Sequence, residues 1–459
     1  MAYYLRWAVG KNLQRPVCIV KNHLEHAMNL FKQSLTSVIF KMINIPITII
    51  IGIITAQMLG PEGKGIYTVI VTISTFISIL GMLGMGNSSI FLVNSRGYDF
   101  KKVYSSLFWF SILWGLVIVG ISAAVFGFLP SIIGKIETGN INYIYIISFL
   151  MILNGFISPM LLTKQRIREI GIISIISLVF QLGFIITAYF VYPEQIFYFV
   201  VLSYIASIFI TIGAAIVYEK SWYLFVPAFN LKILKDVFEY GIKIFIGNLT
   251  LVLNMQFDML LMNYFRTPRE VGIYSVSVML CNFLLVIPGA IGPVLYSNWS
   301  KNKVIETDEV IRASRIIFFL LFFIGCGLAV FGYPFIIIAF GAAFAGAYIP
   351  LVILLPGVIH MGLCYSLFNY FSSRGKPEIT SGILFVCFLI NLGLNIIFIP
   401  KIGINGAAIS SLISYSLSAL LALIYFARTK SIGLREAMAQ TISLRKMLFD
   451  IKEITGDKV

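Results

Sequence analysis

The stretch Pro61–Val69, PEGKGIYTV, decides how this chain is organised, because it returns at Pro268–Val276 as PREVGIYSV. The two copies start 207 residues apart, and each separates two long apolar runs. Two fainter echoes have nearly the same spacing: SYIAS at 203–207 with SYSLS at 414–418, and TKQR at 163–166 with SRGK at 373–376. Repetition at a common spacing predicts that the chain is an internal duplication.

The composition predicts a membrane protein. Of 459 residues, 59% are hydrophobic and only 12% are charged, whereas soluble domains carry about a quarter charged residues. The net charge of +15 would suggest nucleic acid in a soluble protein. Here the basic residues lie between apolar runs, so we expect membrane lipids and no nucleic acid as partners. The five cysteines are dispersed and predict neither a disulfide framework nor a metal site.

A spanning helix needs roughly 20 apolar residues. That rule predicts an all-α integral membrane fold with about twelve transmembrane helices in two homologous six-helix lobes. Because six is even, both lobes enter the membrane in the same direction, and we expect a central cleft between them. The predicted spans are 35–59, 66–93, 104–128, 142–163, 171–192, 196–218, 241–264, 273–297, 316–340, 347–371, 379–399 and 404–427.

The same pattern predicts five regions along the chain. They are an N-terminal cytoplasmic or interfacial segment (1–33), an N-lobe (34–218), an amphipathic linker (219–240), a C-lobe (241–427) and a basic cytoplasmic tail (428–459). Glycine and proline interrupt one apolar run in each lobe, as GMLGMG at 81–86 and PGAIGP at 288–293. Both places are expected to kink or unwind.

The basic residues predict the orientation. With these spans, 29 of the 34 lysines and arginines fall on the side that holds both termini. Loops rich in lysine and arginine stay in the cytoplasm, so both termini are expected to be cytoplasmic. Lys64, in the first copy of the motif, falls on the opposite side.

Few side chains in this sequence can carry chemistry, because the outer loops hold no paired carboxylates, histidine cluster or metal motif. No cofactor is expected. Polar groups inside the apolar runs are therefore the candidate functional positions. Asp258 is the one carboxylate well inside a run, and it indicates either coupling to H⁺ or Na⁺ or a structural hydrogen bond. Five amides are expected either to line a polar cleft or to bond neighbouring helices: Gln57, Asn248, Asn254, Asn391 and Asn395.

Basic and titratable groups complete the candidate set. His360 is the one histidine beyond the N-terminal segment, and it is either a proton relay or phosphate contact, or an ordinary packed residue. Lys41, Lys243, Arg312 and Arg315 lie at predicted cytoplasmic ends of spans. They are candidates for a basic vestibule that receives an anionic headgroup, with anchoring at the lipid interface as the alternative.

Four stretches carry a family resemblance. They are LGPEGKGIYTV (59–69), LGMGNSS (83–89), RTPREVGIYSV (266–276) and LNIIFIPKIGINGAAISSLISY (394–415). With them, residues 34–427 resemble the Wzx-type polysaccharide flippases, the oligosaccharide-lipid translocases of the multidrug/oligosaccharidyl-lipid/polysaccharide exporter superfamily.

This resemblance implies a flippase rather than an enzyme. The chain would move polyprenyl-diphosphate-linked oligosaccharides across the cytoplasmic (inner) membrane of a prokaryote by alternating access, alongside other polysaccharide-assembly proteins. A cation-coupled multidrug exporter of the same superfamily is one alternative, although residues 34–60 hold no acidic group. A flippase for another lipid-linked precursor is a second alternative. A membrane-embedded glycosyltransferase or polymerase is the third, and the short outer loops disfavour it.

Overall fold

The computed structural model describes residues 2–128, 134, 136, 138–226, 229–301 and 305–455, and within them it contains only helices and their connections. Helices dominate because in a bilayer each spanning backbone must satisfy its own hydrogen bonds. The α-helices are α1 (Ala2–Met82), α2 (Met85–Arg96), α3 (Phe100–Phe128), α4 (Thr138–Thr163), α5 (Ile167–Val191), α6 (Ile196–Glu219), α7 (Leu231–Phe265), α8 (Pro268–Lys301), α9 (Thr307–Phe340), α10 (Tyr348–Ser373), α11 (Pro377–Ile402), α12 (Ile404–Lys430), α13 (Leu434–Thr441) and α14 (Leu444–Thr455). Short 3₁₀ helices are η2 (Pro193–Gln195), η3 (Trp222–Phe225) and η4 (Ala342–Ala347).

The predicted all-α membrane fold is confirmed. Ten of the described helices are long and apolar enough to cross a membrane, and α7 becomes an eleventh when its two parts, bent by 49°, count as one span. The first of the ten holds two predicted spans, because Gly60 interrupts α1 with φ 64° and ψ −179°. Glycine adopts this positive φ without a steric penalty. When α1 is counted as two spans divided at Gly60, the ten helices and the bent α7 together give the twelve spans predicted.

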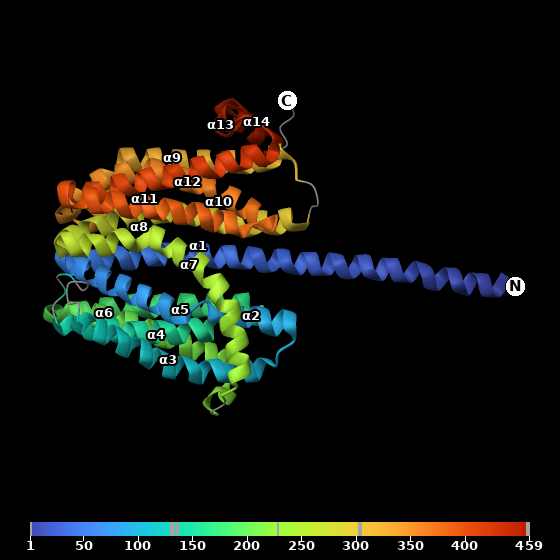
Figure 1. The fold of residues 1–459 in the computed structure, drawn as a ribbon, viewed down its shortest axis with the longest axis horizontal. Helices are drawn as coiled ribbons and strands as arrows, with labels where there is room; N and C mark the ends of the chain where they lie inside the picture. The colour runs from blue at the N-terminus through green and yellow to red at the C-terminus, as the bar shows by residue number, and fades with distance from the viewer. Residues whose placement is uncertain are drawn as a thin grey trace.

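Figure 1 shows two groups of helices, with α2–α6 in one and α9–α12 in the other, and with α1, α7 and α8 between them. We call α1–α6 the N-lobe and α7–α12 the C-lobe. The lobes meet where α1, α2 and α3 contact α7, α8 and α9. The end of the bundle that holds Gly60 and Pro268 is called the motif end, and the opposite end, which holds Lys164, Arg374 and Arg428, is called the basic end.

Only one of the two predicted interruptions unwinds the helix. In GMLGMG, Leu83 (φ 48°) and Gly84 (φ 70°) adopt left-handed conformations and separate α1 from α2. In PGAIGP, α8 continues through Pro288 and Pro293 to Lys301, so the predicted unwound turn is not found there.

The sharp bend of the C-lobe lies instead in α7, between its parts Leu231–Gly247 and Leu249–Phe265. The first part packs on α2 of the N-lobe. The Ser88 hydroxyl donates to the Val237 carbonyl at 2.7 Å, and the rings of Phe91 and Tyr240 stack with centroids 4.2 Å apart. Figure 1 shows this part crossing the bundle near its basic end. One helix therefore contacts both lobes.

Candidate functional site

The two copies of the repeated motif face each other across the seam between the lobes. A Cβ added to Gly65 would lie 1.8 Å from the Pro268 carbonyl oxygen, and one added to Gly272 would lie 1.8 Å from the Pro61 carbonyl oxygen. These reciprocal contacts relate the lobes by a pseudo-two-fold axis. Only glycine permits backbones to approach this closely, so both copies need it at the same register. The seam is closed at the motif end.

The tyrosine two residues beyond Gly272 holds the buried carboxylate of the C-lobe. The Tyr274 hydroxyl donates to Asp258 Oδ2 at 2.7 Å, and the Met259 amide donates to Oδ1 at 2.8 Å. Asp258 is 5% exposed, and the ion pairs of the described residues include none to it. A buried carboxylate without a cation is costly unless it binds a proton or a metal ion.

A chain of polar side chains runs from Asp258 through the C-lobe. Ser411 of α12 lies beside the Tyr274 hydroxyl. Asn391 of α11 donates to Ser411 Oγ at 3.5 Å, and Asn395 donates to Asn391 Oδ1 at 2.7 Å. The Oδ1 atom of Asn395 is buried and has no hydrogen-bond partner. An orphan amide oxygen is rare in a protein interior, and it lies at the far end of this chain from the carboxylate.

The predicted candidate Asn254 lies in the same lobe but has a structural bonding pattern. Its amide donates to the Leu384 carbonyl at 2.6 Å, and Ser414 donates to its Oδ1 at 3.5 Å. It therefore joins α7 to α11 and α12. The structure brings Asn254 and Asp258 together in one lobe, and it adds Tyr274 and Ser411, which the sequence reasoning missed.

The equivalent tyrosine of the N-lobe has different partners. The Tyr67 hydroxyl lies beside Gln181, and the Tyr67 ring meets that of Tyr204 edge-on at 6.3 Å between centroids. Lys64 is 7% exposed, donates to Thr55 Oγ1 at 3.1 Å and lies 5.5 Å from the Tyr67 ring centroid. Near its copy of the motif tyrosine, the N-lobe thus buries a basic side chain, Lys64, whereas the C-lobe buries an acidic one, Asp258. The sequence predicted that Lys64 lies in an outer loop. Gln181 was not predicted, but it lies inside an apolar run, and the expectation that polar groups in such runs are functional, which marked Asp258, would also have marked it.

Arg312 and Arg315 bind the C-terminal tail. Arg315 is 5% exposed, and its Nη1 lies 2.5 Å from Asp450 Oδ2 while its Nε donates to the Gln440 carbonyl at 2.7 Å. Arg312 Nη2 donates to the Asp450 carbonyl at 3.1 Å. Figure 1 shows α13 and α14 beside α9 and α12 near the basic end. The tail therefore engages both arginines, which the sequence did not show, and their place in a basic vestibule stays a prediction.

Asp450→Asn is expected to release the tail, because it leaves Arg315 buried without a counter-ion. Breaking a buried pair costs about 3–5 kcal/mol, and less here because Arg312 is partly exposed. The variant should unfold several degrees lower and lose its tail to trypsin faster than the wild type. Glu436→Gln, at an exposed position of α13, is the control. Equal cleavage rates in all three proteins would contradict this role of the pair.

The remaining predicted candidates lie apart from these networks. Lys41 of α1 and Lys243 of α7 are exposed near the basic end. Asn248 lies at the bend of α7, and its side chain is outside the described part of the structure. His360 is half-buried, with Nδ1 2.9 Å from Ser416 Oγ of α12. Their functional roles stay predictions.

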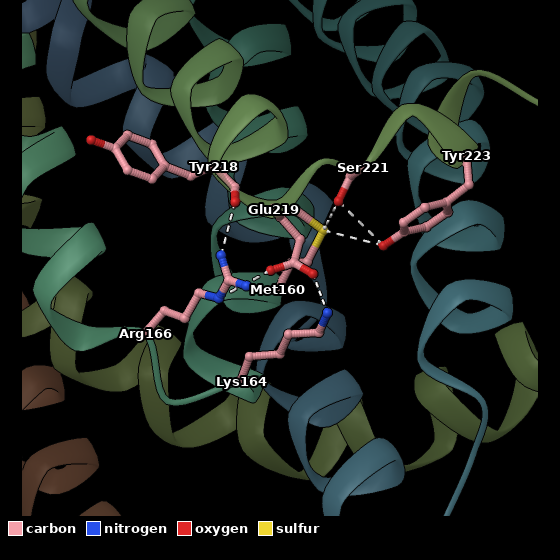
Figure 2. Close-up of polar contacts among 7 residues, drawn as sticks. All are labelled: Met160, Lys164, Arg166, Tyr218, Glu219, Ser221 and Tyr223. Atoms are coloured by element: carbon pink, nitrogen blue, oxygen red, sulfur yellow. Dashed lines mark hydrogen bonds and ion pairs between the residues drawn. The ribbon is translucent and has the colours of Figure 1, made fainter.

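A second ionic cluster fixes the N-lobe at its basic end (Figure 2). The buried Glu219 carboxylate, at the end of α6, pairs with Lys164 and with Arg166 Nε, the latter at 3.4 Å. Arg166 also donates to the Tyr218 carbonyl at 2.8 Å. Nearby in η3, burial raises the pKa of Tyr223 to about 12, so this hydroxyl stays protonated at neutral pH. The cluster ties the ends of α4 and α6 together.

Glu219→Gln should loosen this end of the N-lobe. Two cations would lose their shared partner, but their side chains are 40% and 35% exposed, so water screens part of the loss. We expect the free energy of unfolding to fall by about 1–3 kcal/mol. Thermal unfolding in detergent measures it, with Glu239→Gln, from an exposed pair with Lys235, as the control. A larger loss in the control would contradict the assignment.

A sequence model of the family described as "Polysaccharide biosynthesis protein" matches residues 54–349, which is more than half of the chain. The chain belongs to this family. The matched range of this polysaccharide biosynthesis protein begins in α1 and ends in α10, so it includes both copies of the repeated motif and Asp258.

Individual proteins extend the comparison. The chain is similar to the probable low-salt glycan biosynthesis flippase Agl15 of Haloferax volcanii, with 24% identity over 212 residues that cover 43% of this chain and 44% of the relative. It spans about half the length of the curated relatives it matches. Among solved structures it is similar to the lipid II flippase MurJ in an inward closed conformation (TM-score 0.70, 15% identity, 93% of both chains). It is also similar to an inward-facing MATE family multidrug resistance transporter of the MOP superfamily (TM-score 0.69, 16% identity, 88% of this chain and 99% of the other). These two likenesses establish the fold of a multi-pass membrane protein.

Proposed function

We propose that this protein is a flippase that moves polyprenyl-diphosphate-linked oligosaccharides from the cytoplasmic to the outer leaflet of a prokaryotic cytoplasmic membrane. The observation that carries the proposal is the reciprocal Gly65–Gly272 seam between duplicated lobes, in a member of a polysaccharide biosynthesis family. Alternating access needs two lobes that meet closely at one end and can separate there. A relative named as a probable glycan biosynthesis flippase supports the substrate class.

The physical problem that the protein solves is desolvation. A diphosphate and several sugars cannot enter hydrocarbon, because transferring charged and polar groups out of water costs many kcal/mol. The prenyl chain stays in the bilayer while the headgroup passes between the lobes. Lys41 and Lys243, exposed near the basic end, are the proposed first contacts of the diphosphate. No bond is made or broken, so the protein acts as a transporter.

The polar chain in the C-lobe is the proposed coupling site. Binding of H⁺ or Na⁺ at Asp258 would neutralise a buried carboxylate that has no basic partner among the described ion pairs. Neutralisation would change the cost of exposing this site to one side of the membrane or the other. Membrane lipids and other polysaccharide-assembly proteins are the proposed partners.

The test is translocation by the purified chain in proteoliposomes, followed by the access of an external lectin to a fluorescent polyprenyl-diphosphate trisaccharide. Protein-dependent access that follows an ion gradient supports the proposal. A cation-coupled multidrug exporter is the second candidate, favoured by the similarity to the MATE transporter. Dye transport without movement of the glycolipid would favour the exporter, and a change in the glycan's mass would favour an enzyme.

A further inference from the structure

A cavity of about 320 Å³ lies inside the N-lobe, between α4, α5 and α6. It extends from Leu161 and Ile170, near the basic end, to Gln181 and Tyr204, about half-way along their helices. Its polar wall is made of five hydroxyls and one carboxamide, on Ser158, Ser174, Ser177, Gln181, Ser207 and Thr211. Within the part of the chain that the structure describes, no charged side chain lines it.

This lining narrows the class of ligand. A cation would need a carboxylate, and a phosphate would need lysine or arginine, but neither kind of residue is present in the wall. Several of these hydroxyls already donate within the lobe, as Ser158 does to Asn154 and Ser207 to the Tyr204 carbonyl, so they offer lone pairs that can accept from the hydroxyls of a sugar. The Tyr204 ring and the aliphatic wall offer apolar surface to the C–H faces of a sugar ring.

The polar wall is held in place by contacts between its own side chains and by contacts with residues outside the cavity. Ser177 Oγ and Thr211 Oγ1 lie 2.8 Å apart and link α5 to α6, and the Gln181 carboxamide lies beside the Tyr67 hydroxyl. At the basic end, the Glu219 cluster of Figure 2 ties α4 to α6. Such support keeps hydroxyls oriented before a ligand arrives, which lowers the entropic cost of binding.

One acceptor beside the cavity has no partner. Asn44 of α1 donates to Ser174 Oγ at 2.9 Å, while its Oδ1 atom is buried without a hydrogen bond. Buried amide oxygens in proteins normally have a partner, so this atom is an unmet acceptor on α1, next to Ser174 of the cavity wall. The same helix forms the seam with α8. The cavity therefore lies directly behind a helix of the translocation seam.

We propose that this cavity binds the distal, uncharged sugar rings of the lipid-linked oligosaccharide while the diphosphate remains in the seam. The inference rests on the proposed function and adds a saccharide subsite to it. The volume is at the lower end of the range for ligand pockets, about 300–1,000 Å³, and suits a short saccharide. A headgroup with a single sugar would not reach the cavity.

The test compares substrates of different length in the proteoliposome assay. Ser207→Phe fills the cavity, and its hydroxyl bonds only the Tyr204 carbonyl of its own helix, so no contact between helices is lost. Thr187→Phe, on an exposed face of α5, is the matched control. We expect Ser207→Phe to move a polyprenyl-diphosphate monosaccharide at the wild-type rate and the trisaccharide at less than a tenth of it, and the control to move both normally.

Gln181→Leu provides a second, nearly isosteric variant. It should raise the half-saturating trisaccharide concentration several-fold and leave that of the monosaccharide unchanged. The subsite is refuted if folded Ser207→Phe protein moves both substrates normally, or loses both equally. Failure of the wild type to move either glycolipid would instead refute the proposed function, so the two failures are distinguishable.

Discussion

Gly65→Val and Gly272→Val are each expected to abolish translocation, with a loss of at least a hundredfold in rate. In the structure, even a methyl group at either position would lie 1.8 Å from a carbonyl oxygen of the opposite lobe. Backbone cannot yield as a flexible side chain does, so α1 and α8 must move apart. The conformation closed at the motif end then becomes inaccessible, whereas a conformation open at that end is unaffected.

The measurement combines the lectin assay with the reactivity of Ser275→Cys, a buried position of α8. In either valine variant this cysteine should react faster with a membrane-impermeant maleimide added from the motif side. Gly289→Ala is the control, because a Cβ at Gly289 of α8 meets nothing within 4 Å. Normal translocation by both valine variants would show that this closure is not needed.

Asp258→Asn is expected to slow translocation at least tenfold and to remove its dependence on an ion gradient. The amide oxygen can still accept from Tyr274, so the hydrogen bond survives while the charge is lost. Because the substitution removes a buried carboxylate without a counter-ion, thermal stability should be equal or higher. Translocation against imposed pH and Na⁺ gradients measures the loss of coupling.

Two tyrosine variants separate charge from hydrogen bonding. Tyr274→Phe leaves the carboxylate without its hydroxyl donor and should lower the free energy of unfolding by about 1–3 kcal/mol. Tyr67→Phe is the counterpart in the N-lobe, where the hydroxyl lies beside Gln181, and it should leave gradient dependence intact. Wild-type coupling in Asp258→Asn would refute the assignment of the ion site.

The duplicated architecture could be predicted because its determinants are local. Apolar runs of spanning length, separated by repeated turn motifs, predict the number and order of helices without knowledge of their packing. The left-handed turn at Leu83–Gly84 was also foreseeable, since glycine permits it. The continuity of α8 could not be foreseen from the sequence. Prolines inside a spanning helix are tolerated when neighbouring groups satisfy the freed carbonyls, and that depends on packing.

The candidate site was predictable only in part, because partners depend on folding. Asp258 was marked by its own burial cost, but Tyr274 came to light only when α7 and α8 packed together. Arg312 and Arg315 are three residues apart and share a helix face, which suggested a basic vestibule. Their partner Asp450 lies far along the chain, so the sequence did not reveal the pairing. Lys64 follows a turn and is nevertheless buried, because it folds back on Thr55.

The contact between Arg315 and Asp450 also bears on how the protein is made. Asp450 follows Arg315 by 135 residues, so a ribosome adds the anion only after α10, α11 and α12 have been made. Nascent chains that stop early would keep that charge uncompensated. The C-lobe therefore cannot neutralise this buried arginine until the tail has been made and has folded back on α9.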